Sequence, residues 1–240
     1  MVIEMKKIVF GTWSISGDYG YKNETKSKAL LKSSVNKGIL EFDTAPNYGF
    51  GYAEYLIGNT LKNKRGLLFN TKIGNNHLKE KNFQIKSLEK SFFKSLHNLG
   101  SINILFLHNP RDDLDSKKVL SFLNDLKKNK LIKNFGLSLA RDHNYTNNFI
   151  NKFKIFQLDY SLLNFYEPFK KYKKLVYGRS PFASGLLSNN ILLSKIKKED
   201  HRKKWPSKRR LLIINKKKNY IIKSSEKELK KNAIQFVKYS

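Results

Sequence analysis

Four side chains of the chain combine types and spacings that suit proton chemistry at a carbonyl group. Asp43, Lys72 and His108 each end a short apolar run, and Tyr48 lies five positions after Asp43. A phenol with a pKa near ~10 is a poor acid at neutral pH, but a neighbouring ammonium favours its phenolate. Lys72 can supply that ammonium, Asp43 can hold it charged, and His108 can orient a substrate oxygen or share in the proton relay. Together they predict a proton donor for a carbonyl oxygen that receives a hydride.

The elements that must position these residues follow a regular alternation along the chain. Short apolar runs alternate with segments of helical period, which predicts a parallel sheet buried on both faces. The expected strands are Ile8–Gly11, Ile39–Asp43, Leu67–Lys72, Ile102–His108, Asn134–Ser138, Ile155–Asp159 and Leu175–Arg179. The expected helices are Thr25–Lys37, Tyr52–Asn63, Phe83–Leu99, Ser116–Asn129, Asn144–Lys152, Tyr166–Lys173 and Ser225–Tyr239.

Two architectures fit this alternation: an open doubly wound sheet and a closed (β/α) barrel. The G-x-G-x-x-G fingerprint that would favour the open sheet is missing, because GTWSISG follows the first strand and only Gly49 and Gly51 follow the second. In a barrel, the carboxyl ends of the strands ring one mouth, where such folds hold their active sites. The strands that end in polar or titratable residues do so at Asp43, Lys72, His108, Ser138 and Arg179–Ser180. A (β/α)8 barrel of the TIM type is therefore favoured.

The composition excludes several classes of protein. The chain has no Cys, which excludes disulfides, thiolate metal sites and a Cys nucleophile, and which fits a reducing compartment. The start MVIEMKKIVF has too short an apolar run for a signal peptide, and no later run approaches the ~18 residues that span a bilayer. The remaining histidines, His77, His97, His143 and His201, show no metal-ligand spacing. We expect a cytoplasmic protein with no metal site and no membrane association.

The strong positive charge has two interpretations. The net charge of +29 could indicate nucleic acid, an anionic membrane surface or an acidic substrate. Arg, which gives the bidentate contacts typical of base and phosphate readers, occurs only 7 times among the 48 basic residues. Codon bias with a solvated Lys surface explains the charge better, and we expect no specific nucleic-acid partner.

The residues around the proposed site resemble the aldo-keto reductase family. The segment FDTAPNYGFGYAEYLIG resembles its signature of an aspartate, a tyrosine after a short loop, and a glycine–glutamate helix start. TKIG is similar to its lysine strand and ILFLHNP to its histidine strand, while FGLSLA and FQLDYSLLN look like the next two strands. RSPFASGLL resembles the seventh-strand loop, and GTWSISGDYG and DHRKKW match loops of one branch of the family. The resemblance covers nearly the whole chain in the right order.

This resemblance implies roles for ten residues and a cofactor. The family's catalytic tetrad falls on Asp43, Tyr48, Lys72 and His108. The positions that would bind the cofactor are Ser138 and Gln157 at the nicotinamide carboxamide, Arg179 beside the ring, and Ser180, Phe182 and Gly185 in the pyrophosphate loop. The implied cofactor is NADPH or NADH, and the implied substrate is a small aldehyde or ketone.

The sequence also departs from the family pattern in two places. Leu139 stands where family members often carry an asparagine that also touches the carboxamide. The chain ends straight after what looks like the seventh helix, so it resembles a C-terminally short member without the eighth βα unit, with seven of the eight strands. We expect one barrel domain over residues 1–240, with a basic surface loop at 195–224 and a terminal helix at 225–239. The loop and helix, or a partner in an oligomer, would cover the open edge, or the chain is a truncated relative.

Three functions follow from these observations. The first is a working NAD(P)H-dependent reductase of aldehydes or ketones. The second is a catalytically inactive barrel remnant that acts as a binding or scaffold protein. The third is a basic protein that binds an anion or nucleic acid through residues 195–231, which predicts steeply salt-dependent binding.

Overall fold

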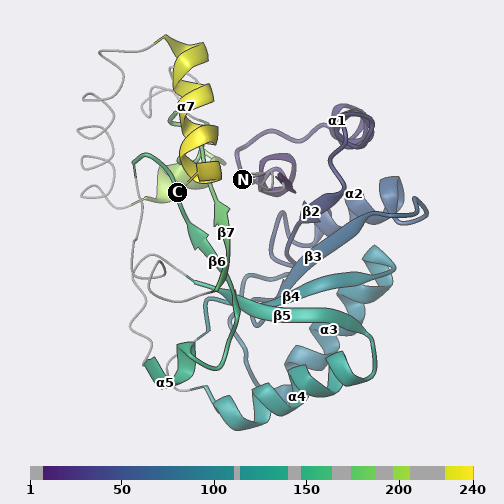
Figure 1. Cartoon of the computed structure of the whole chain (residues 1–240). Coiled ribbons are helices and arrows are strands. Elements are labelled where there is room, and N and C mark those ends of the chain that lie inside the picture. Colours follow the sequence, from purple (N-terminus) through teal and green to yellow (C-terminus); the bar gives the residue numbers. More distant parts are fainter. Residues whose placement is uncertain are drawn as a thin grey trace.

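Seven parallel strands form one sheet in the order of the chain, and the sheet curls into a nearly closed barrel (Figure 1). The computed structural model describes residues 8–110, 114–139, 147–163, 174–187, 197–205 and 225–239. The strands are β1 (Val9–Gly11), β2 (Glu41–Asp43), β3 (Leu68–Ile73), β4 (Ile102–His108), β5 (Ile132–Ser138), β6 (Ile155–Asp159) and β7 (Leu175–Arg179). The α-helices are α1 (Glu24–Asn36), α2 (Tyr52–Leu61), α3 (Ile85–Leu99), α4 (Ser116–Lys128), α5 (Asn147–Ile150) and α7 (Glu226–Tyr239). Two short 3-10 helices are η1 (Trp13–Ile15) and η4 (His201–Lys204).

The predicted barrel of parallel strands is confirmed, and the element boundaries shift by a few residues. β3 continues one residue beyond Lys72 because Ile73 pairs with Leu107 of β4. β5 begins earlier than expected because Ile132 pairs with Ile102. The described part of α5 is a single turn, shorter than the expected helix at 144–152, and the helix expected at 166–173 lies outside the described residues.

The alternation of side chains along each strand separates two layers. Outward residues such as Phe42, Leu105 and Leu107 pack with the helices in the main hydrophobic core. Inward residues fill the barrel, where Ile104 and Phe106 pack with Ile155 and the partly buried Tyr177. Because side chains two positions apart share a face, the residues at 41 and 43, 70 and 72, and 106 and 108 all lie on the inner side.

The helices cover the outer face of the sheet as amphipathic elements. α3 buries Leu88, Phe92 and Leu99 and ends at Gly100, whose left-handed φ of 78° allows the chain to turn back into β4. Figure 1 shows α2, α3 and α4 following one another around the outside of β2 to β5. α3 packs against β3 and α4 packs against β5, so these helices support the strands from outside.

The two outer strands of the sheet differ from the inner ones. β1 pairs with β2 and β7 with β6, and within the described residues no ladder joins β1 to β7. Leu175 of β7 remains 55% exposed. α7 covers the outer face of β7, where Val237 packs against Gly178, and Phe236 stacks at 5.3 Å on Tyr160, which directly follows β6. The terminal helix thus occupies the place of a seventh crossover helix.

The described part of the predicted basic surface loop is partly buried. Residues 197–205 contain η4, and Asp200, Arg202 and Trp205 are all less than 8% exposed. Arg202 is held by Asp200, whose Oδ1 accepts from its Nε at 2.9 Å, and it donates through Nη1 to the Ser184 carbonyl at 3.0 Å. A buried, paired arginine is a packing residue, while Lys197, Lys198, Glu199 and Lys204 of the same stretch are exposed. Residues 206–224 lie outside the described part of the chain.

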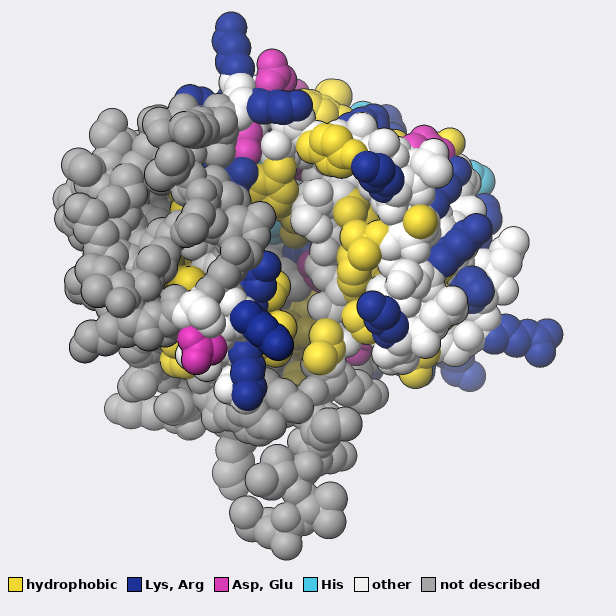
Figure 2. Space-filling model, turned by 90° about the horizontal axis from the view of Figure 1, so that it is seen from above, with side chains coloured by type: hydrophobic (Ala, Val, Ile, Leu, Met, Phe, Trp, Pro, Cys, Tyr) yellow, Lys and Arg dark blue, Asp and Glu magenta, His cyan; other side chains and the backbone are white. Residues whose placement is uncertain are grey.

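The basic side chains follow no single stripe on the face shown in Figure 2. The described Lys and Arg side chains lie scattered among hydrophobic and polar ones on this face. A scattered distribution is typical of a solvated surface rather than of a groove that tracks a phosphate backbone. None of the helices that the structure describes is long and apolar enough to cross a membrane.

Candidate active site

The four predicted catalytic side chains come together inside the carboxyl end of the barrel. Asp43 ends β2, Lys72 is the penultimate residue of β3 and His108 ends β4, while Tyr48 lies in the loop after β2. All four are buried, with exposed fractions of 0% for Lys72 and at most 8% for the others. A group buried this deeply must find its partners inside the protein.

Lys72 and Asp43 form the ion pair at the centre of the site. The Lys72 ammonium donates to Asp43 Oδ2 at 2.7 Å and to the Thr44 carbonyl at 2.7 Å. Burial opposes the charged form of Lys72, but the Asp43 carboxylate and Tyr48 outweigh it and raise the pKa of Lys72 above its usual value. Lys72 is therefore a fixed cation at neutral pH.

Tyr48 lies next to this cation and between two other rings. The Lys72 ammonium is 4.7 Å from the centroid of the Tyr48 ring. The His108 ring lies edge-on to Tyr48 at 6.3 Å between centroids, and the Trp13 ring lies edge-on at 4.6 Å. The phenol is thus confined among a cation, an imidazole and an indole.

His108 is neutral in this environment. Burial, and next the positive charges of Lys72, Arg179 and Lys81, hold the pKa of His108 well below its usual value of 6.5. Its Nδ1 is buried and finds no hydrogen-bond partner among the described residues. A neutral imidazole can donate one hydrogen bond to a substrate oxygen without competing with Lys72 for the role of cation.

Ser138 and Gln157, predicted to hold a carboxamide, continue the polar chain from Asp43. The register places His108, Ser138 and Gln157 side by side on β4, β5 and β6. Ser138 Oγ donates to Gln157 Oε1 at 2.9 Å, and Gln157 Nε2 donates to Asp43 Oδ1 at 2.7 Å. Gln157 therefore also helps to hold Asp43, a contact between residues 114 positions apart that the sequence did not indicate. The carboxamide role of both residues stays a prediction.

The residues predicted to line a pyrophosphate loop follow β7. Arg179 ends this strand and donates through Nη2 to the Leu139 carbonyl at 2.8 Å, while its buried Nε finds no partner among the described residues. Ser180 and Gly185 have left-handed φ values of 59° and 87°. Phe182 packs against the buried cluster that includes Leu186, and so anchors the loop. Left-handed residues in such turns direct backbone N–H groups into anion-binding concavities.

Two residues near the site were not assigned a role from the sequence. Trp13 contacts Tyr48 directly, and its indole Nε1 is buried without a partner among the described residues. Glu54 of α2 is 1% exposed and accepts from Thr71 Oγ1 at 2.6 Å, beside Lys72. Burial raises the pKa of Glu54. The glutamate in the helix-start motif thus ties α2 to the strand that carries Lys72.

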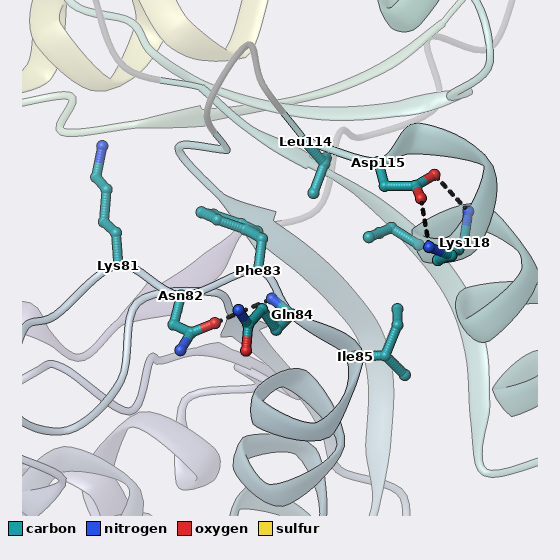
Figure 3. Close-up of a pocket in the computed structure, with 9 residues that line it drawn as sticks. Lys81, Asn82, Phe83, Gln84, Ile85, Leu114, Asp115 and Lys118 are labelled. Atoms are coloured by element: carbon teal, nitrogen blue, oxygen red, sulfur yellow. Dashed lines mark hydrogen bonds and ion pairs between the residues drawn. The ribbon is translucent and has the colours of Figure 1, made fainter.

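A cavity of about 630 Å³ lies between the loops that follow β3 and β4 (Figure 3). Phe83, Ile85 and Leu114 supply apolar lining, and Asp115 on one side is paired with Lys118 at 3.1 Å. The ring of Phe83 also contacts Gly74, two residues after Lys72, so this cavity borders the end of β3. Within the described residues, no group of His, Cys, Asp or Glu could hold a metal ion.

The chain is similar to one protein family and to several of its curated members. The family model of the Aldo/keto reductase family matches residues 7–239. The aldo-keto reductase YhdN of Bacillus subtilis (strain 168) is 39% identical over 61 residues, 25% of this chain and 18% of that protein. The NADH-specific methylglyoxal reductase of Escherichia coli (strain K12) is 27% identical over 188 residues, 68% of this chain and 57% of that protein. The chain thus spans less than two thirds of the length of either relative.

Solved structures share the fold. The glycerol dehydrogenase AKR11B4 from Gluconobacter oxydans superposes with a TM-score of 0.68 at 21% identity, over 86% of this chain and 69% of its own. The aldo-keto reductase AKR11C1 from Bacillus halodurans superposes with a TM-score of 0.67 at 22% identity, over 98% and 87%. These similarities agree with the seven-stranded barrel, and with the family match over residues 7–239 they lead to one conclusion. The chain belongs to the aldo/keto reductase family.

Proposed function

We propose that the chain is a cytoplasmic NAD(P)H-dependent oxidoreductase that reduces an aldehyde or ketone to an alcohol. One observation carries the proposal: the fully buried Lys72 ammonium is bound to Asp43 and lies beside Tyr48. A buried cation next to a phenol is an arrangement that stabilises the phenolate. That stabilisation serves a reaction in which the phenol gives up its proton.

The proton would pass from the Tyr48 hydroxyl to the carbonyl oxygen of the substrate. Lys72 stabilises the phenolate left behind, and Asp43 keeps Lys72 charged and in place. The neutral His108 donates a hydrogen bond that orients the same oxygen. When bound, the nicotinamide supplies the hydride to the carbonyl carbon. The role of the chain is therefore to hold the carbonyl and to provide the proton.

The residues present fit a dinucleotide at this site. Arg179 Nε is buried and unpartnered among the described residues, as expected for a donor that a ligand would satisfy. Ser180 and Gly185 belong to a turn with left-handed residues that suits a diphosphate. Ser138 and Gln157 lie buried beside Asp43, where they would hold a carboxamide. We propose these residues as the cofactor site, with NADPH and NADH both open.

The cavity beside β3 and β4 would receive the remote part of the substrate. Its apolar residues Phe83 and Leu114 lie on loops that follow the strands of Lys72 and His108. Substrate-binding loops in such barrels occupy the carboxyl ends of the strands. Because one relative is named as an NADH-specific methylglyoxal reductase, methylglyoxal with NADH is the first pair to assay, followed by aromatic aldehydes with NADPH.

The test is a fluorescence titration of the 240-residue chain with each nucleotide, followed by turnover assays. Saturable binding is expected, and Tyr48→Phe should abolish turnover while leaving nucleotide binding nearly intact. Tyr55→Phe, at a 49% exposed tyrosine away from the four residues, is the matched control. Turnover retained in Tyr48→Phe contradicts the assigned role. A folded chain that binds neither nucleotide would instead support the inactive-barrel alternative.

A further inference from the structure

The loop that carries Tyr48 has an unusual backbone. Gly49, Phe50 and Gly51 follow Tyr48 directly, and all three have left-handed φ values of 58°, 59° and 93°. A non-glycine residue in this region is strained, and such a conformation persists only where the surroundings fix it. The loop itself supplies a turn in which Tyr52 N–H donates to the Gly49 carbonyl at 3.2 Å. The backbone of Tyr48 is bonded within this segment, and the strained residues directly after it also need contacts from outside the loop.

Asp18, in the loop after β1, makes the contact that holds Gly49. Gly49 N–H donates to Asp18 Oδ2 at 2.9 Å, and Ser16 Oγ donates to the same oxygen at 2.8 Å. The two loops touch so closely that a Cβ on Gly49 would lie 2.1 Å from the Ser16 carbonyl oxygen. Asp18 is 8% exposed. A buried carboxylate thus binds the residue next to Tyr48.

The second carboxylate oxygen of Asp18 binds a residue of a third loop, the one after β3. Lys79, in the loop after β3, donates to Asp18 Oδ1 at 2.7 Å. The same ammonium lies 4.5 Å from the centroid of the Phe50 ring. Lys79 therefore contacts the Phe50 ring while it pairs with Asp18, and the two carboxylate oxygens of Asp18 bind residues of different loops.

The backbone of Asp18 joins a fourth segment. His201 N–H donates to the Asp18 carbonyl at 2.9 Å, and its ring Nδ1 lies 3.1 Å from the same oxygen. The His201 ring packs edge-on against Trp13 at 5.3 Å, and Trp13 in turn contacts Tyr48. Asp18 thus connects the loops after β1, β2 and β3 with the segment that contains η4.

We infer that Asp18 is a positioning residue that sets the place of Tyr48 through Gly49. It is not a catalytic residue, because it reaches Tyr48 only through the backbone of the next residue. The inference rests on the proposed function for its kinetic part, since it assigns Tyr48 as proton donor. Its structural part, the anchoring of Gly49 by Asp18 Oδ2, stands independently of turnover.

Three variants separate the contacts of Asp18. Asp18→Ala removes both the Gly49 and the Lys79 contact. Asp18→Asn keeps an oxygen that can accept from Gly49 and removes the ion pair, and Lys79→Met removes the ion pair alone. Glu228→Ala removes a carboxylate that also accepts from a backbone N–H and a serine hydroxyl, those of Ser225, but lies exposed near the start of α7, so it is the matched control.

The measurements are hydrogen exchange of the peptide that contains Gly49, the nucleotide dissociation constant, and kcat and KM for one carbonyl substrate. Asp18→Ala should speed exchange at residues 47–53 and lower kcat by about 10²-fold, as expected for a misplaced catalytic group. Nucleotide binding should not change, because the residues proposed to hold the cofactor lie on β5, β6, the end of β7 and the loop after β7. Asp18→Asn and Lys79→Met should keep wild-type exchange at Gly49 and most of kcat.

Two results would overturn the inference. The first is a wild-type rate of hydrogen exchange at Gly49 in Asp18→Ala. The second is a decrease of kcat in Asp18→Asn as large as that in Asp18→Ala. The second result would assign the effect to the ion pair instead. Should Asp18→Ala fail to fold, residue-resolved hydrogen exchange of the wild-type chain decides instead, because the Gly49 amide bonded to Asp18 Oδ2 should exchange slowly and an unprotected amide contradicts the inference. A wild-type chain without turnover would refute the proposed function, while the exchange data would still decide the role of Asp18.

Discussion

Removing the charge of Lys72 should destabilise the fold as well as stop the reaction. Lys72 is fully buried, and its ammonium lies 2.7 Å from both Asp43 Oδ2 and the Thr44 carbonyl. In Lys72→Met the Asp43 carboxylate stays buried, with Gln157 Nε2 as the donor that remains from these side chains. Breaking a buried ion pair from one side costs about 3–5 kcal/mol. For a chain of this size, each kcal/mol lowers Tm by roughly 2–4 °C.

A double-mutant cycle isolates the pair. Asp43→Asn leaves Lys72 buried with the Thr44 carbonyl as its acceptor, so it should also cost about 3–5 kcal/mol. The double variant Asp43→Asn/Lys72→Met buries no charge at this place, and the amide oxygen introduced at position 43 can still accept from Gln157. The double variant should therefore lose clearly less free energy of unfolding than the sum of the losses in the two single variants. All three variants should lack turnover.

The assay is urea unfolding followed by circular dichroism at neutral pH, with thermal unfolding as a second readout. The direction of the Lys72 pKa shift determines the pH range in which the unfolding assay must be run. Because the pKa of Lys72 is raised in the folded protein, its contribution is complete below the unfolded value near ~10.4 and is lost only as pH rises through the higher folded value. Additive losses in the cycle, or an unchanged Tm in Lys72→Met, would refute the ion pair as the centre of the site.

Three further predictions test other parts of the barrel. Burial and the charge of Lys72 hold the pKa of His108 below 6.5, so at lower pH the unfolded chain binds a proton that the folded chain does not. Stability should therefore fall as pH drops below about 6.5. His108→Gln should reduce the Tm difference between about pH 7.5 and pH 5. Tyr177→Phe removes the hydroxyl that donates to Glu41 Oε1 at 3.1 Å across the barrel, and should cost about 1 kcal/mol in urea unfolding. Leu114→Trp should fill part of the cavity of about 630 Å³ and raise KM for a bulky aromatic aldehyde but not for methylglyoxal.

The strands and their ends were predictable because two independent signals agreed. Apolar runs gave the strands, and the polar residue at the end of each run gave the direction in which the mouth opens. The bounds Ile102–His108, Ile155–Asp159 and Leu175–Arg179 are those of β4, β6 and β7. Pairing of these strands in parallel register places His108, Ser138 and Gln157 side by side.

The contacts between loops were not predictable, because they join residues far apart in sequence with no periodic pattern. Asp18 meets Gly49 across 31 positions and Lys79 across 61. Composition also does not show which basic side chains are buried and paired inside the fold. Arg202 counts as one more basic residue in the sequence, yet it is 7% exposed and pairs with Asp200. Charge counts describe a surface only where the charged side chains are not paired inside the fold.

The four proposed catalytic residues therefore divide into two groups with different physical support. Asp43, Lys72 and His108 lie on strands whose ladders fix their backbones, and all three side chains are buried. Tyr48 lies on a strained loop that depends on contacts from neighbouring loops. Substitutions of these three strand residues should lower stability and turnover together, because the same buried groups serve both. Substitutions that disturb the support of Tyr48 should lower kcat with little change in the free energy of unfolding, because the contacts of a loop add little to the stability of the core.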